Sequence, residues 1–266
     1  MHLAGVYIRR AQSVASKDDA RAAWREVVRI HEQWQGDDIE AFEASLRLLA
    51  VDTTHIEALD EVDRLGTKVQ AFGRLAQVYA RLVKDAPSDK LRVSLLLRAA
   101  DLMERQARDP AAALDRLLLC CKLAPSDEQV LARAEELARR LGNHSDLLWL
   151  EEQRATRADD RGAKVLALLE AARTADIGVG DREQAMAYVR QALELGVGDD
   201  VLLRKVEDLA AELDAARPAL GKDDARRTLV RDLLEISGQT PEPDRTATVL
   251  HAARYVREQL HDEGAS

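Results

Sequence analysis

The chain repeats itself at a fixed interval, and this periodicity constrains its fold more than any other feature of the sequence. The alignment joins three segments without a gap: DDIEAFEASLRLLAVDTTH at 37–55, DPAAALDRLLLCCKLAPSD at 109–127 and DREQAMAYVRQALELGVGD at 181–199. The period is therefore seventy-two positions, from 37 to 109 and from 109 to 181. Four of its columns keep their character: Asp37, Asp109 and Asp181; Ala41, Ala113 and Ala185; Val51, Leu123 and Leu195; and Leu59, Leu131 and Leu203. A period of this length indicates an array in which one supersecondary unit packs against the next.

The pattern inside each repeat predicts helices. Apolar residues of the middle repeat fall at helical spacing, as in Ala113, Leu114, Leu117, Leu118 and Cys121. The aligned Asp suits a helix N-cap, and Pro110 suits the first helical position. We expect helices in this repeat at about 89–108, 110–123, 127–141 and 145–158. Four helices in one period amount to two helical hairpins.

At this point the chain resembles the tetratricopeptide repeat family. DPAAALDRLLLCCKLAP and DREQAMAYVRQALELG are similar to the second helix of that family's hairpin, with an early Ala followed by apolar residues at helical spacing. The family's closing Pro is Pro125, which Thr53 and Val197 replace in the other repeats. The resemblance implies an all-α fold, a right-handed α-solenoid of stacked antiparallel helical hairpins.

Repeat and resemblance together divide the chain into three parts. Residues 1–16 are expected to form a half-hairpin helix at the edge of the array. Residues 17–235 are expected to form a solenoid like that of tetratricopeptide repeat (TPR) proteins, with three units of seventy-two residues. A linker and a C-terminal helix fill 236–266. This last helix carries an apolar stripe: Val249, Ala252, Ala253, Val256 and Leu260.

The start of the chain matches the second half of a hairpin. LAGVYIR at 3–9 aligns with LAQVYAR at 75–81, again one period away. Leu3, Val6 and Tyr7 then form an apolar stripe without the usual preceding helix, and we expect them to be an association edge. The chain is accordingly expected to belong to a longer array or to dock this edge on another surface, including a second copy.

The two adjacent cysteines are assigned to the core. Cys120 aligns with Leu48 and Ala192, and Cys121 with Leu49 and Leu193. A cysteine packs like a small hydrophobe. Adjacent helical positions point about 100° apart, so the two thiols are poorly placed to share a metal. The alternative, a redox or metal role, would need a His or Cys cluster that the sequence does not contain.

No sequence motif indicates catalysis. HEQWQ at 31–35 lacks the second His of a zinc-protease helix. GVGD at 178–181 and 196–199 follows no predicted strand, and is interpreted as a helix stop and start. The acid pairs Glu135-Glu136 and Glu151-Glu152 are assigned to solvated helix faces. We therefore expect no enzyme activity, no catalytic residue, no cofactor and no metal site.

The tryptophans are the remaining candidates for contact with a partner. Aromatic side chains of a helical array fill gaps between hairpins or line a binding groove. For Trp24 a core position is preferred over a groove position. For Trp34, which lies near a helix end, a groove position is favoured more than it is for Trp24. Both are kept as possible protein-binding residues.

Charge and composition limit the classes of partner that the chain is expected to bind. The net charge is −9, which argues against a general nucleic-acid binder because such a protein needs a basic face. Two cysteines indicate a reducing compartment, and no run of 18 apolar residues exists, so we expect a cytoplasmic protein without membrane contact. The expected function is a non-catalytic scaffold or adaptor that binds a peptide or helix in a concave groove. The alternatives are a regulatory or sensory segment of a larger signalling protein or enzyme such as a kinase and, more remotely, an RNA-binding helical repeat.

Overall fold

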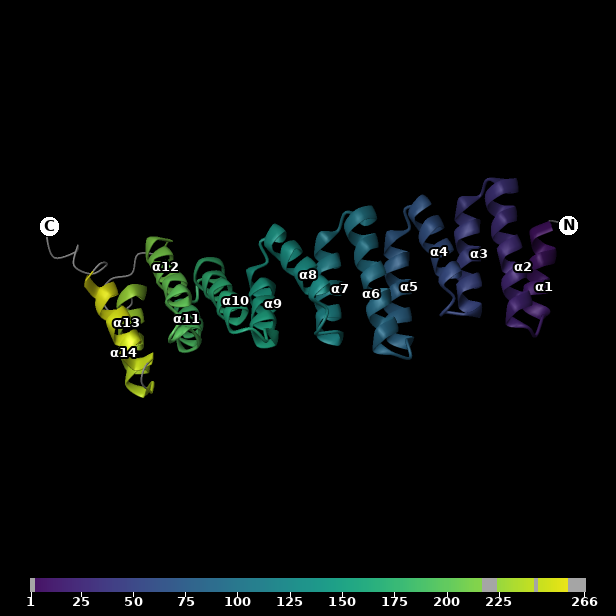
Figure 1. Cartoon of the computed structure of the whole chain (residues 1–266). Coiled ribbons are helices and arrows are strands. Elements are labelled where there is room, and N and C mark those ends of the chain that lie inside the picture. Colours follow the sequence, from purple (N-terminus) through teal and green to yellow (C-terminus); the bar gives the residue numbers. More distant parts are fainter. Residues whose placement is uncertain (1–2, 217–223, 242–243, 258–266) are drawn as a thin grey trace. The chain divides into compact units, whose positions relative to one another are not determined.

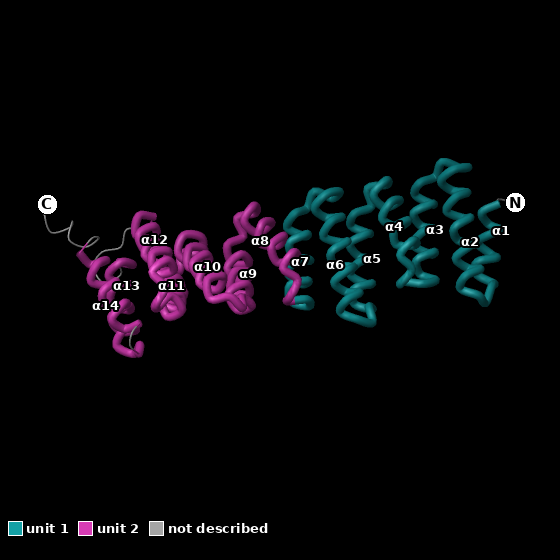
Figure 2. The backbone as a smooth tube through the Cα atoms, viewed as in Figure 1, with its two compact units in different colours: residues 1–124 teal, residues 125–266 magenta. Residues whose placement is uncertain are grey.

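The computed structural model describes residues 3–216, 224–241 and 244–257. These residues form a helical repeat protein with two compact units, unit 1 at 1–124 and unit 2 at 125–266 (Figure 2). Within the described ranges the regular elements are fourteen α-helices and three π-helical segments, without a strand (Figure 1). The all-α fold expected from the sequence is thereby confirmed.

Unit 1 contains seven α-helices, and two of them continue as π-helical segments. Its elements are α1 (Leu3–Ser13), α2 (Lys17–Arg29), η1 (Ile30–Gln35), α3 (Asp38–Val51), α4 (Ile56–Lys68), α5 (Phe72–Asp85), α6 (Asp89–Leu102), η2 (Met103–Ala107) and α7 (Pro110–Leu123). Neighbours along the chain pack against each other, most extensively α2 against α3 and α6 against α7.

Unit 2 continues the same alternation of helices and short turns. Its elements are α8 (Glu128–Leu141), α9 (His144–Arg157), α10 (Arg161–Arg173), η3 (Thr174–Val179), α11 (Arg182–Gly196), α12 (Asp200–Ala216), α13 (Ala225–Gln239) and α14 (Asp244–Tyr255). The four helices expected in the middle repeat are confirmed to within one residue at each end.

Helix starts recur with the sequence period because capping side chains recur. Each cap accepts a hydrogen bond from a backbone N–H two or three residues further on, which satisfies a donor that has no partner inside the helix. The caps are Ser16, Ser88 and Asp160 for α2, α6 and α10; Asp37, Asp109 and Asp181 for α3, α7 and α11; and His55, Asp127 and Asp199 for α4, α8 and α12. The expected Asp caps are confirmed.

Helices α2, α6 and α10 also end alike, in π-helical turns that the sequence did not predict. The N–H of Asp37, Asp109 or Asp181 donates to the carbonyl six residues earlier, at 2.8, 2.9 and 2.8 Å. The residue just before each Asp has a left-handed backbone: Gly36 at φ 66°, Arg108 at φ 56° and Gly180 at φ 87°. The interpretation of GVGD as a helix stop and start is confirmed, since Gly180 and Gly198 have positive φ and the next residue caps a helix.

A second left-handed turn recurs between α4 and α5 and between α8 and α9. Gln70 has φ 56° and Gly142, its counterpart in the next repeat, has φ 66°. The next N–H donates to the carbonyl five residues earlier, from Ala71 to Gly66 at 2.8 Å and from Asn143 to Ala138 at 2.9 Å. The turn geometry is therefore the same in both repeats whether or not glycine occupies the left-handed position.

Two of the aligned apolar columns lie in the core, those of Ala41 and Leu59, whereas the column of Val51 is half-buried. Ala41, Ala113 and Ala185 are completely buried. Both Cys120 and Cys121 are buried as well, which confirms their assignment to the core.

We expect the two cysteines to differ in their contribution to stability. Cys121→Ala should lower the free energy of unfolding by about 1–3 kcal/mol, because Leu49 and Leu193 show that its column holds a larger side chain and a cavity would remain. Cys120→Ala should cost less, because Ala192 already fills that column. Urea denaturation of both variants measures the difference, and a larger loss at Cys120 would contradict the assignment.

The last two helices depart from the repeat. One full period beyond Asn143, the cap of α9, the sequence has Ala215, whereas Asp224 caps α13. Helix α13 extends to Gln239, past the expected boundary at 235.

The apolar stripe expected on the last helix is wrong in part. Val249 and Ala253 are exposed, while Ala252 is buried and Leu260 lies outside the described residues. The buried face of α14 instead carries Thr248, His251, Ala252 and Tyr255. On this face His251 Nε2 lies 2.7 Å from Glu207 Oε1 of α12. None of the helices in the described ranges has both the length and the hydropathy that a membrane crossing requires.

Candidate functional site

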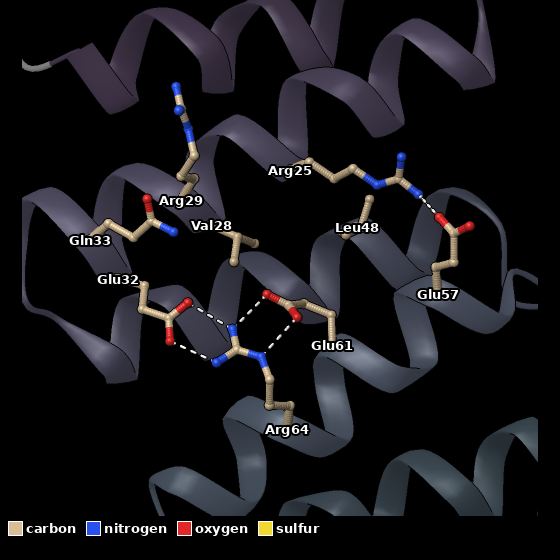
Figure 3. A pocket seen from close by; sticks show the side chains of 9 residues that line it. All are labelled: Arg25, Val28, Arg29, Glu32, Gln33, Leu48, Glu57, Glu61 and Arg64. Atoms are coloured by element: carbon tan, nitrogen blue, oxygen red, sulfur yellow. Dashed lines mark hydrogen bonds and ion pairs between the residues drawn. The ribbon is translucent and has the colours of Figure 1, made fainter.

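In unit 1, side chains from the even-numbered helices α2, α4 and α6 surround two adjoining cavities. The first has a volume of about 320 Å³, and its lining comes mainly from α2, η1 and α4 (Figure 3). The second has a volume of about 480 Å³, and its lining comes from α4, α6 and η2. Arg64 lines both cavities. We call the two together the unit 1 groove.

Arg64 holds the first cavity together. Its guanidinium donates two parallel hydrogen bonds to Glu32, each 2.7 Å long, and two further bonds to Glu61 (Figure 3). Hydrogen bonds from Arg64 and Lys68 lower the pKa of Glu32 to about 2, because they stabilise its ionised form. Arg25 pairs with Glu57 across the same two helices. Glu32 therefore stays ionised at neutral pH.

Three side chains form a hydrogen-bonded cluster beside the second cavity, in which Asp63 Oδ1 is buried without a partner. Asp63 Oδ2 accepts hydrogen bonds from the Tyr79 hydroxyl at 2.6 Å and from Arg98 Nη2 at 2.8 Å. Burial and the charge of Asp63 raise the pKa of Tyr79, so its hydroxyl remains a donor. The carboxylate of Asp63 thus comes from α4, the hydroxyl of Tyr79 from α5 and the guanidinium of Arg98 from α6.

The unit 1 groove is balanced in charge, unlike the whole chain. Its ionisable lining comprises Arg25, Arg29, Arg64, Arg98 and Arg105 against Glu32, Glu57, Glu61, Asp63 and Asp101. Such a surface suits a partner that carries charges of both signs.

In unit 2, helices α8, α9 and α10 surround a cavity of about 240 Å³. We call it the acidic cavity, lined by Glu135, Glu151, Arg154, Ala163, Leu166, Ala167 and Glu170. Glu135 is 4% exposed and Glu151 3% exposed, so the sequence-based assignment of these residues to solvated faces is wrong. The reason is that α10 packs against α9 and covers this side of unit 2.

The buried carboxyls of the acidic cavity are only partly compensated. Arg154 pairs with Glu135, and Arg139 Nη2 lies 3.9 Å from Glu151 Oε1. Glu135 Oε1 and Glu151 Oε2 are buried and have no hydrogen-bond partner. Burial raises the pKa of Glu151 to about 7, against the opposing effect of a Thr174 hydrogen bond, and it also raises the pKa of Glu135.

The raised pKa of Glu151 makes stability depend on pH. Between about pH 4.5 and 7 the folded chain keeps a proton on Glu151 that the unfolded chain has released, so the free energy of unfolding falls as pH rises. Gln cannot ionise. Glu151→Gln should therefore match the wild type near pH 4.5 and exceed it by about 1–3 kcal/mol at pH 8.

Urea denaturation across this pH range measures the effect, and the exposed neighbour Glu136 provides the control. Glu136→Gln should follow the wild type at every pH. A constant offset between Glu151→Gln and the wild type would contradict the shifted pKa.

The two candidate tryptophans occupy different environments. Trp24 is 5% exposed and lies in the core, with the Arg47 guanidinium 5.6 Å from its ring centroid. Its indole is therefore not presented to a partner. Trp34 is 65% exposed in η1, and the Arg29 guanidinium lies 5.9 Å from its ring centroid. Because Arg29 lines the unit 1 groove, Trp34 lies close to the groove's rim.

Two of the three residues of the N-terminal stripe are exposed. Leu3 is 43% exposed, whereas its counterpart Leu75 is completely buried, because α4 packs against α5. Val6 is exposed and Tyr7 half-buried, whereas Tyr79, the counterpart of Tyr7, is buried. Only small residues, Ala4 and Ala11, are buried in α1.

We expect this edge to drive self-association or, in a monomer, to leave α1 frayed. Burial of one such side chain contributes roughly 1.5–3 kcal/mol. Changing Leu3, Val6 and Tyr7 to polar residues should suppress association in sedimentation velocity, while hydrogen exchange of the helices after residue 18 stays unchanged. A wild-type monomer with a strongly protected α1 would contradict the expectation.

Comparison with known proteins gives no family. No family model matches the sequence, and no curated protein matches it significantly. One similar solved chain comes from the computational design of self-assembling cyclic protein homooligomers; it shares 12% identity, covers 97% of this chain and 90% of its own, and has a TM-score of 0.15. A TM-score this low bears on neither fold family nor function.

Proposed function

We propose that the chain is a non-catalytic protein-binding scaffold, similar to tetratricopeptide repeat proteins, that holds a peptide or a helix in the unit 1 groove. The observation that carries the proposal is that two cavities on α2, α4 and α6 adjoin at Arg64. Two cavities that share a lining residue suit an elongated ligand rather than a small molecule.

The lining chemistry supports a peptide ligand. Arg25 and Arg64 are about half exposed in their ion pairs with Glu57 and Glu32. The Arg25–Glu57 pair is exposed on both sides, and such a pair contributes little to stability, so a partner's carboxylate or ammonium group can exchange with it at small cost. Trp34 adds an exposed indole near the rim, and aromatic side chains are enriched where proteins bind each other.

Selection of peptides from a displayed library against the purified chain tests the proposal. Selected peptides should bind Arg64→Ala at least tenfold more weakly than the wild type, because this change alters both cavities. They should bind Arg81→Ala equally well, since Arg81 is highly exposed on α5 and lines neither cavity. Circular dichroism checks that both variants are folded. Equal binding to both variants would place the peptide site elsewhere.

A further inference from the structure

The acidic cavity of unit 2 is the repeat counterpart of the polar cluster in unit 1. The sequence period aligns Asp63, Tyr79 and Arg98 with Glu135, Glu151 and Glu170. In unit 1 the three side chains are an acceptor, a hydroxyl donor and a cation, and they bond to one another. In unit 2 all three are carboxyls, so the cation of the cluster is missing from the same place in the repeat.

Buried carboxyl oxygens lack donors in both clusters, one in unit 1 at Asp63 Oδ1 and two in unit 2. Arg154 compensates one oxygen of Glu135, while Glu151 has Arg139 near one oxygen and a hydrogen bond from Thr174. The other oxygen of each, Glu135 Oε1 and Glu151 Oε2, is buried without a hydrogen bond. Unpaired buried acceptors are unfavourable and uncommon in folded proteins. A donor from outside the chain would satisfy both.

We propose that the acidic cavity binds the cationic head of a lysine or arginine side chain from a partner peptide, in the place that Arg98 fills in unit 1. Three of its ionisable lining residues are carboxyls and one is a guanidinium. Ala163, Leu166 and Ala167 provide an apolar wall for the methylene stem of such a side chain. Glu170 is exposed, and one of its carboxylate oxygens pairs with Arg173. Its carboxylate is therefore accessible to solvent beside the two buried carboxyls.

The dimensions and donor set favour a single side chain over other ligands. A volume of about 240 Å³ is below the usual range for drug-sized molecules, which begins near 300 Å³. No cluster of three or more His, Cys, Asp or Glu residues arranged for a metal ion occurs in the ranges that the structure covers. An ammonium group has three N–H donors, which matches the three carboxyls.

Binding of a cation should release a proton near neutral pH. Glu151 has its pKa raised to about 7 by burial, and the charges that face it are Glu135 and Arg139 from α8 and Glu170 from α10. A cation beside Glu151 favours its ionised form, so affinity should rise between pH 6 and pH 8.

The experiment is calorimetric titration of the full chain with Nα-acetyl-lysine methylamide and Nα-acetyl-arginine methylamide. Cadaverine is titrated as well, to represent a small free amine rather than a peptide side chain. The neutral Nε-acetylated lysine derivative serves as the uncharged control. At least one cationic amide should bind, with proton release at pH 7 shown by buffers of different ionisation enthalpy. The neutral derivative should not bind. Tighter binding of cadaverine than of both amides would overturn the assignment to a partner peptide and indicate a free-amine site.

Three variants localise the site. Glu151→Gln should weaken binding at least tenfold and remove the proton release, and it is expected to fold because it lacks the buried ionisable group. Glu170→Arg should abolish binding by restoring the internal cation of unit 1. Glu136→Gln, at an exposed position next to Glu135, should bind as the wild type does.

Absence of binding by any cationic probe, or unchanged binding to Glu151→Gln, would overturn the proposal. The test of the acidic cavity does not depend on the unit 1 groove, because Arg64→Ala should leave these titrations unchanged.

Discussion

Arg182→Met should lower the free energy of unfolding by about 3–5 kcal/mol, a large effect for a single substitution. Arg182 of α11 donates to Asp176 of η3 at 3.0 Å and to the Leu213 carbonyl of α12 at 3.1 Å, and it also pairs with Asp214. Asp176 is completely buried. Its carboxylate would lose this cation in the variant, and loss of one partner of a buried ion pair is strongly destabilising.

The exposed pair on the same helix provides a matched control. Arg190 pairs with Glu235 in a solvent-accessible position. It also lies 3.9 Å from the buried Asp232, but Arg231 pairs with that carboxylate more closely, so Arg190→Met should cost much less than Arg182→Met. Hydrogen exchange should show lost protection in α10, α11 and α12 of Arg182→Met and unchanged protection in α2 to α4, because repeat proteins are stabilised mainly by nearest neighbours. Similar urea midpoints for the two variants would show that Arg182 does not support this junction.

Leu117→Ala should cost about 2–5 kcal/mol. Leu117 is completely buried in α7, which packs against α6. Its repeat counterparts Ser45 and Val189 are also completely buried, so the column lies in the core throughout. Removal of three carbon atoms leaves a cavity that the packed helices can close only in part.

Leu119, two residues away on the same helix and 46% exposed, is the control for that substitution. Leu119→Ala should change the urea midpoint far less than Leu117→Ala does. Equal losses from the two variants would mean that α7 is rotated about its axis relative to the structure described.

The repeat made the helices and their caps predictable. A cap acts within three residues of the chain, so the recurrence of Asp37, Asp109 and Asp181 was sufficient to place the starts of three helices. Burial of Cys120 and Cys121 followed from the apolar residues in their columns. These inferences needed only local chemistry and alignment.

The candidate sites were harder to predict because they depend on which helices meet. Glu135 and Glu151 belong to helices that pack against each other, and α10 covers them, so each looks like a surface residue in its own helix. A signal did exist in the alignment. Asp63, Glu135 and Glu207 form an acidic column, and each of its members has a partner from another helix. The π-helical turns left no such signal, because Arg108 stands where Gly36 and Gly180 occur.

The left-handed turns have a consequence for anyone who builds longer arrays from this chain. Each of the first two repeats places glycine at only one of the two left-handed positions, Gly36 with Gln70 and Arg108 with Gly142. A non-glycine residue in this conformation costs roughly 1–2 kcal/mol. A concatemer of either natural repeat would multiply that cost with every copy. A hybrid that takes its first turn from Gly36 and its second from Gly142 avoids it at both turns, and its melting temperature should rise above that of either parent concatemer of equal length.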